Sequence, residues 1–206
     1  MSSSPRIDAE AESSNLVREA LSFSRDAHEG DVRETGSGEI PFIEHPLAVA
    51  ERLAEEGFGE EVLAAALLHD VVEHAEVAHA ELERRFGERV AGLVAAMTEE
   101  ETIERYQDRK EEHRRRVAAA GPDARAIFTA DKMANVEVLR EAYDIEGEDV
   151  DAALPVSLDL KIYVWELDLE MLFNESPGVP LVDRFADEMT GLWGQRAAEA
   201  RASYGG

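Results

Sequence analysis

The sequence predicts an all-α fold built as a single helical bundle. Apolar residues recur at helical spacing along most of the 206 residues. No segment alternates apolar and polar residues as a half-buried strand would. Glycine or proline stands at most of the points where one predicted helix ends and the next begins. A chain of this length can bury a sizeable core.

The predicted elements follow in order from the N-terminus. Residues 1–12 are polar and are expected to form a disordered leader. A helix should begin at Ser13, Ser14 or Asn15, which are good N-caps, and should end before Gly30. Residues 30–44 hold glycines and Pro41, so they are predicted to be a loop. Further helices are expected over 46–56, 60–75, 78–86, 88–97, 123–143, 155–173 and 180–203, with 99–119 as a solvated helix or a flap.

The charge balance excludes several function classes. The chain has 21 basic and 46 acidic residues and a net charge of −25, which repels nucleic acid and anionic membranes.

The chain has no cysteine, so thiolate metal sites and cysteine nucleophiles are excluded. The N-terminus lacks a signal-peptide pattern, and the longest aliphatic run, Val62 to Leu68, is too short to span a membrane. A soluble, cytoplasmic protein is the expectation.

The dipeptide His69-Asp70 is the first candidate for chemistry. It follows seven aliphatic residues, and a charged aspartate is costly to bury unless a cation or a hydrogen-bond partner compensates it. Glu73 and His74 lie three to five residues further on, so a continuous helix would crowd all four on one side. Imidazole and carboxylate groups are ligands for hard or borderline metal ions.

The segment around this dipeptide resembles the HD signature of the RelA/SpoT-type alarmone hydrolases, in particular their small, hydrolase-only members. The resemblance continues in motif order over about residues 15–175. Its segments are residues 27–33, 40–50, 65–73, 86–94, 109–110 and 130–135, together with Tyr163. It implies one HD-type phosphohydrolase domain over residues 13–206.

The resemblance also implies the site. The metal ligands would be His45, His69, Asp70 and Asp131, a donor set that suits Mn²⁺, although another divalent metal would also fit. Glu73 would orient or deprotonate the attacking water, and Asn135 could hydrogen-bond that water or a substrate hydroxyl. The implied reaction removes the 3′-pyrophosphate of guanosine tetra- or pentaphosphate.

The implied substrate is a small, highly anionic nucleotide, so local positive charge must overcome the overall acidic field. The residues expected to bind it are Arg33, Arg109, Lys110, Lys132 and Tyr163. Arg33 matches a family arginine that lies against the guanine base, and a planar guanidinium suits such stacking. Tyr163 is expected to contact the nucleoside.

His74 departs from the family pattern, which usually has Glu-Asp where this chain has Glu73-His74. The imidazole could be a catalytic general acid, a fifth metal ligand, or a sign of altered or lost activity. Glu34 also replaces a basic residue found in relatives. These departures leave two alternatives open: an HD phosphohydrolase for another nucleotide, such as an adenosine alarmone or the 2′-phosphate of NADPH, and a catalytically degenerate nucleotide-binding domain.

One polar histidine and two tryptophans are predicted to have structural rather than catalytic positions. His113 lies in a polar stretch and is expected to be exposed to solvent. Trp165, Trp193 and the apolar face of the last helix should be buried, either within the domain or against a second copy of the chain, so a homo-oligomer stays open.

Overall fold

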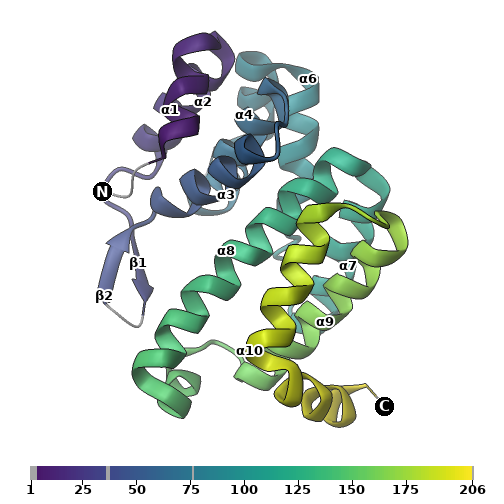
Figure 1. Cartoon of the computed structure of the whole chain (residues 1–206). Coiled ribbons are helices and arrows are strands. Elements are labelled where there is room, and N and C mark those ends of the chain that lie inside the picture. The colour runs from purple at the N-terminus through teal and green to yellow at the C-terminus, as the bar shows by residue number, and fades with distance from the viewer. Residues whose placement is uncertain (1–3, 36–37, 76, 206) are drawn as a thin grey trace. The chain divides into compact units, whose positions relative to one another are not determined.

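The computed structural model describes residues 4–35, 38–75 and 77–205. Within them it contains ten α-helices, one 3₁₀ helix and one two-stranded sheet (Figure 1). The predicted all-α class is therefore confirmed. The contacts gather into two compact units: a first unit of residues 1–33 and 40–131, and a second unit of residues 34–39 and 132–206. None of the described helices is long and apolar enough to cross a membrane.

The prediction of a disordered leader is wrong for residues 5–12, because the first unit begins with helix α1 (Pro5–Ser13). Its Ile7 and Ala11, one helical turn apart, are buried, and Ile7 has no exposed surface. The Glu51 carboxylate accepts hydrogen bonds from the backbone N–H groups of Arg6 and Ile7 at 3.1 and 3.0 Å. These N–H groups have no partner within the helix, so the distant carboxylate satisfies them.

Truncating Ile7 to alanine is expected to lower the free energy of unfolding by about 2–4 kcal/mol, because it leaves a cavity where a full side chain is buried. Urea unfolding followed by circular dichroism measures this change. The control is Glu12→Ala, an exposed position on the same helix. If α1 did not contribute to stability, Ile7→Ala and Glu12→Ala would lower the free energy of unfolding by the same small amount.

Helix α4 (Glu60–Leu68) is the centre of the first unit. Residues 62–68 are all buried, which agrees with their nearly uninterrupted apolar sequence. The helices packed against α4 are α2 (Asn15–Ala27), α3 (Glu44–Glu55) and α6 (His79–Met97), and α7 (Tyr106–Ala120) packs on α6. The C-terminal end of α4 is therefore surrounded by side chains of the neighbouring helices.

Several predicted helix boundaries are confirmed. The Ser14 hydroxyl accepts a hydrogen bond from the Val17 N–H at 3.3 Å and so caps α2. Gly87 leaves the helical conformation within α6, with φ +87° and ψ 164°, which is the predicted division between two helical segments. The predicted helix over 60–75 is wrong in part, because α4 ends at Leu68 and a single helical turn, α5 (Val71–His74), follows.

The prediction that residues 30–44 form a loop without strands is wrong in part. Two short strands, β1 (Val32–Thr35) and β2 (Gly38–Pro41), pair as a hairpin. Residues 36 and 37 between them lie outside the described residues. The described side chains of the hairpin are exposed or partly exposed, so no alternation of apolar and polar residues announces it.

The second unit holds the part of α8 (Pro122–Glu146) after Asp131, the 3₁₀ helix η1 (Gly147–Ala153), α9 (Leu158–Glu175) and α10 (Pro180–Tyr204). Helices α9 and α10 run side by side in Figure 1 and pack together. Trp165 and Trp193 are buried, as predicted. The apolar residues Leu181, Phe185 and Met189 of α10 are also buried in this single chain, so they need no second copy to cover them.

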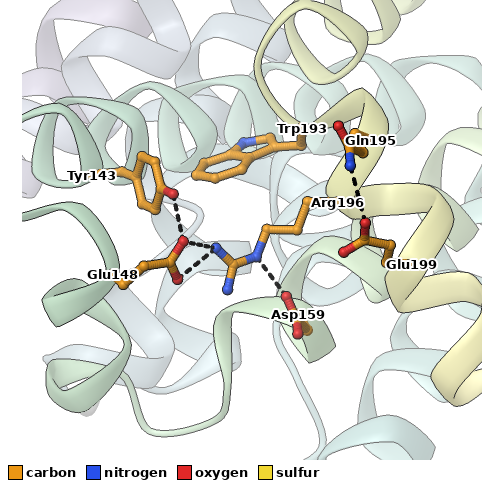
Figure 2. Close-up of a pocket in the computed structure, with 7 residues that line it drawn as sticks. All are labelled: Tyr143, Glu148, Asp159, Trp193, Gln195, Arg196 and Glu199. Atoms are coloured by element: carbon orange, nitrogen blue, oxygen red, sulfur yellow. Dashed lines mark hydrogen bonds and ion pairs between the residues drawn. The ribbon is translucent and has the colours of Figure 1, made fainter.

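An open pocket of about 520 Å³ in the second unit is crossed by Arg196 of α10 (Figure 2). Its guanidinium contacts Asp159 of α9 at 2.6 Å and Glu148 of η1 at 2.8 Å, and the Tyr143 hydroxyl donates to Glu148 at 2.7 Å. The Arg196 guanidinium is thus paired with two carboxylates, and the contacts of Arg196 with Glu148 and Asp159 connect α10 to η1 and α9.

Candidate metal centre

His69 and Asp70 lie in the turn between α4 and α5, where the buried helix ends. The His69 side chain is 3% exposed. Its Nδ1 lies 2.8 Å from the carbonyl oxygen of Ala66, one turn back along α4. That carbonyl only accepts, so Nδ1 carries a proton and donates it, and in the neutral imidazole Nε2 therefore holds the free electron pair.

Two further elements bring His45 and Asp131 to the same place. His45 lies in the first turn of α3 and Asp131 lies in α8, and both side chains are buried. The His45 Nε2 lies 3.1 Å from the Asp131 Oδ1 and 3.5 Å from the Asp70 Oδ2. The His69 Nε2 lies 3.2 Å from the Asp70 Oδ1 and 3.9 Å from the Asp131 Oδ1. The four predicted ligands therefore converge within the first unit.

This donor set fits a divalent metal. Ligand atoms about 2.1 Å from an ion and at right angles to each other lie about 3 Å apart, close to the shorter distances here. The His69 Nε2 is buried and has no hydrogen-bond partner among the described residues, although it faces two carboxylates. A bound cation would use that electron pair and offset the repulsion between Asp70 and Asp131.

The pKa shifts describe the same mutual attraction. Burial would lower the pKa of His69, but the Asp70 and Asp131 carboxylates outweigh burial and raise it. Burial would raise the pKa of Asp70, yet the imidazoles of His69 and His45 hold it below its usual value. For His45, burial dominates and lowers the pKa. Asp70 is thus an ionised carboxylate near neutral pH, as a metal ligand should be.

Glu73 and His74 of α5 adjoin this centre. One ligand atom from each of Asp70, Glu73 and His74 lies within 4.8 Å of the others. Burial and the Asp70 carboxylate raise the pKa of Glu73, although a backbone hydrogen bond acts in the opposite direction. The His74 side chain is exposed, and its ring lies 4.6 Å from the ring of Phe42. Glu73 is therefore a partly buried carboxylate with a raised pKa that adjoins Asp70.

Glu99, which no sequence motif marks, connects this centre to two predicted substrate-binding residues. Its backbone N–H donates a hydrogen bond to the Glu73 carboxylate. Its own carboxylate accepts from the Arg109 Nε at 3.0 Å and from the Lys110 Nζ. One acid among 46 has no local signal that could have identified it.

His113 and Arg33 also lie in the first unit. The prediction that His113 is exposed is wrong, because its ring is buried edge-on against Phe128 at 5.3 Å, and its Nδ1 lies 3.7 Å from Glu99. Arg33 lies in β1 and is partly buried.

The remaining predicted site residues belong to the second unit. Lys132 is buried and Asn135 partly buried, and both follow Asp131 in α8. Tyr163 of α9 lies against Tyr204, with 5.8 Å between ring centroids. The functional roles of these three residues stay predictions.

Comparison with known proteins points to one family. A family model described as HD domain matches residues 20–154, which include the four candidate ligands, Glu73 and Glu99. Among solved structures, a Listeria monocytogenes protein, lmo0812, superposes with a TM-score of 0.67 at 32% identity, over 73% of this chain and 99% of that one. A metazoan ortholog of SpoT described as hydrolysing ppGpp superposes with a TM-score of 0.68 at 25% identity, over 89% and 96%.

Curated relatives are longer. A guanosine-3′,5′-bis(diphosphate) 3′-pyrophosphohydrolase of Aquifex aeolicus is 38% identical over 161 residues, which are 75% of this chain and 23% of that protein. The bifunctional (p)ppGpp synthase/hydrolase SpoT of Escherichia coli is 38% identical over 171 residues, 78% of this chain and 24% of that protein. The chain spans about a quarter of the length of these relatives.

Proposed function

Because the chain belongs to the HD-domain family, we propose that it is a metal-dependent phosphohydrolase that removes the 3′-pyrophosphate of guanosine tetra- and pentaphosphate. The observation that carries this proposal is the buried convergence of two imidazoles and two carboxylates, with Glu73 beside them. The substrate is supported by the relatives that are named for this reaction and by the similar structure described as hydrolysing ppGpp.

The four ligands His45, His69, Asp70 and Asp131 would hold the metal, and Mn²⁺ is the ion that we propose. Two imidazole nitrogens and two carboxylates suit this cation better than Ca²⁺ or Mg²⁺, which prefer oxygen ligands alone. When bound, the ion would act as a Lewis acid toward a phosphoryl oxygen and lower the pKa of a water molecule.

Glu73 accepts the proton of the attacking water in this proposal. Its raised pKa makes it a better proton acceptor near neutral pH than an ordinary glutamate. The water oxygen forms a bond to the phosphorus attached to the ribose 3′ oxygen, and the bond between that phosphorus and the 3′ oxygen breaks. The 3′ oxygen takes up a proton from solvent, and the products are free pyrophosphate and GDP or GTP. The Glu99 N–H fixes the orientation of Glu73 for this step.

The remaining residues bind the nucleotide. Arg109 and Lys110 of α7 both contact the Glu99 carboxylate, and the Glu99 backbone N–H donates to Glu73, so these two cations are proposed to bind substrate phosphates. Arg33, Lys132, Asn135 and Tyr163 are proposed to complete the binding of base, ribose and phosphates.

A nucleotide panel tests the proposal. Purified protein loaded with Mn²⁺ should release pyrophosphate from guanosine tetraphosphate faster than any phosphate product from adenosine alarmones or NADPH. Metal content, measured on the same sample, should be about one ion per chain. A protein that binds the metal but leaves guanosine tetraphosphate intact would contradict the proposed substrate.

A second candidate function, hydrolysis of a different nucleotide, is favoured by His74. This imidazole is exposed, lies against Phe42 and stands where the family usually has a carboxylate. If His74 has redirected the specificity, His74→Asp should raise guanosine tetraphosphate hydrolysis by about tenfold relative to the other nucleotides, while wild type prefers one of those. His79→Asp, at an exposed histidine of the same unit, is the matched control. Under the primary proposal, wild type already prefers the guanosine nucleotide.

A further inference from the structure

We infer that Glu99 competes with the anionic substrate for Arg109 and Lys110, so that this enzyme carries its own competing anion. The inference rests on the proposed function, because it takes these two cations as the binding site for a substrate phosphate. Glu99, Arg109 and Lys110 are called the Glu99 cluster below.

The Glu99 cluster is compact and mostly buried. The Glu99 carboxylate is 16% exposed, and its two oxygens each receive one cation, Arg109 on Oε2 and Lys110 on Oε1. Two positive side chains thus converge on a single carboxylate, and one positive charge of the three groups remains unmatched. A phosphate that approaches this pair finds its attraction reduced by the carboxylate already in contact with both cations.

The Glu99 cluster lies at the edge of the reaction centre. The same residue that holds both cations donates its backbone N–H to Glu73, the proposed base. Glu73 in turn lies within 4.8 Å of Asp70, by one ligand atom of each. The two cations are therefore connected to the metal ligands through Glu99 and Glu73, and in this inference they receive a phosphate of the bound substrate.

Glu99 is not needed to hold Arg109 in place. The Arg109 Nη1 also donates to the Ile103 carbonyl oxygen at 3.0 Å. The guanidinium and the Lys110 ammonium lie 5.8 and 5.3 Å from the centroid of the Tyr106 ring. Removing the Glu99 charge therefore leaves these contacts available while it frees two donors for an incoming anion.

The test is the binding of inorganic pyrophosphate to the metal-loaded protein, measured by calorimetry. Glu99→Gln keeps the shape of the side chain and the backbone N–H to Glu73, and it should lower the Kd by about three- to tenfold, the size expected for one like charge at a partly exposed site. The KM for guanosine tetraphosphate should fall in parallel. The difference in Kd between wild type and Glu99→Gln should become smaller at high salt, which screens exposed charges.

The control is Glu100→Gln, which removes the same charge from the next residue. Glu100 hydrogen-bonds Thr102 and lies outside the Glu99 cluster. Glu100→Gln should change the Kd for pyrophosphate by less than about twofold, because it removes an exposed charge that contacts neither cation. In a Glu99→Gln chain that also carries Arg109→Gln and Lys110→Gln, the gain in affinity should disappear.

The outcomes separate this inference from the proposed function. Tighter pyrophosphate binding without hydrolysis of any guanosine nucleotide would contradict the function and support the competition. Hydrolysis with equal Kd values in Glu99→Gln and Glu100→Gln, or with weaker binding in Glu99→Gln, would overturn the competition. Absence of pyrophosphate binding in all variants would overturn it as well. Glu99→Ala serves as a second variant if the glutamine variant unfolds, with the same expected direction.

Discussion

Asp70→Asn is expected to lower nucleotide hydrolysis by about 10³-fold or more, a rise of about 4 kcal/mol in the activation barrier. The substitution keeps the size of the side chain and removes the charge that faces two imidazoles. One oxygen of the Asp70 carboxylate lies 3.2 Å from the His69 Nε2, and the other lies 3.5 Å from the His45 Nε2. Asp70 therefore contacts both of the proposed imidazole ligands. A neutral amide is a weak ligand for a divalent ion.

Metal affinity gives a readout that does not depend on turnover. Wild-type protein should unfold at a higher temperature with Mn²⁺ than with a chelator, because an ion that binds only the folded state stabilises it. Asp70→Asn should lose most of this difference. The control is Asp26→Asn, an exposed aspartate of the same unit, which should keep it. If Asp70→Asn bound the metal as tightly as wild type, Asp70 would not be a ligand.

Glu73→Gln is expected to lower kcat by about 10²- to 10⁴-fold, the usual contribution of a general base. The glutamine oxygen can still accept the hydrogen bond from the Glu99 N–H, so the local fold should persist. The variant loses only the ability to take a proton. Metal binding should stay close to wild type, because Glu73 lies outside the four proposed ligands.

The measurement is kcat at saturating metal, together with the metal-induced shift in unfolding temperature. Glu83→Gln, at an exposed glutamate of α6, should leave both unchanged. A variant that retained full kcat would remove Glu73 from the mechanism and would favour a domain that binds a nucleotide without turning it over. A variant that lost the metal would instead make Glu73 a ligand.

The strongly patterned parts of the fold could be predicted from the sequence. The aliphatic run of α4, the Ser14 cap and the change of direction at Gly87 all depend on local chemistry. Helix α1 could not be predicted in this way. It buries Ile7 and Ala11 only, and the carboxylate that satisfies its first N–H groups comes from Glu51, 44 residues away from Ile7. The hairpin was missed because its strands bury little.

The same distinction applies to the candidate centre. The His-Asp dipeptide and its spacing to Glu73 are visible in the sequence, and the resemblance to a family supplied His45 and Asp131. Glu99 and the burial of His113 depend on contacts across the fold. Glu99 is linked to Glu73 over 26 residues, and His113 is covered by Phe128 of another helix. No local rule separates such an acid or imidazole from an exposed one.

The early end of α4 constrains any attempt to make this protein more heat-resistant. Common stabilising strategies lengthen helices and replace turn residues by strong helix formers. In a helix that continued regularly, the Ala66 carbonyl would accept from the backbone four residues later. Here it accepts from the His69 ring. Straightening residues 66–74 would turn the break between α4 and α5 into helix and so move the side chains of His69 and Asp70, which lie in that break. A gain in helix stability would therefore be expected to weaken metal binding.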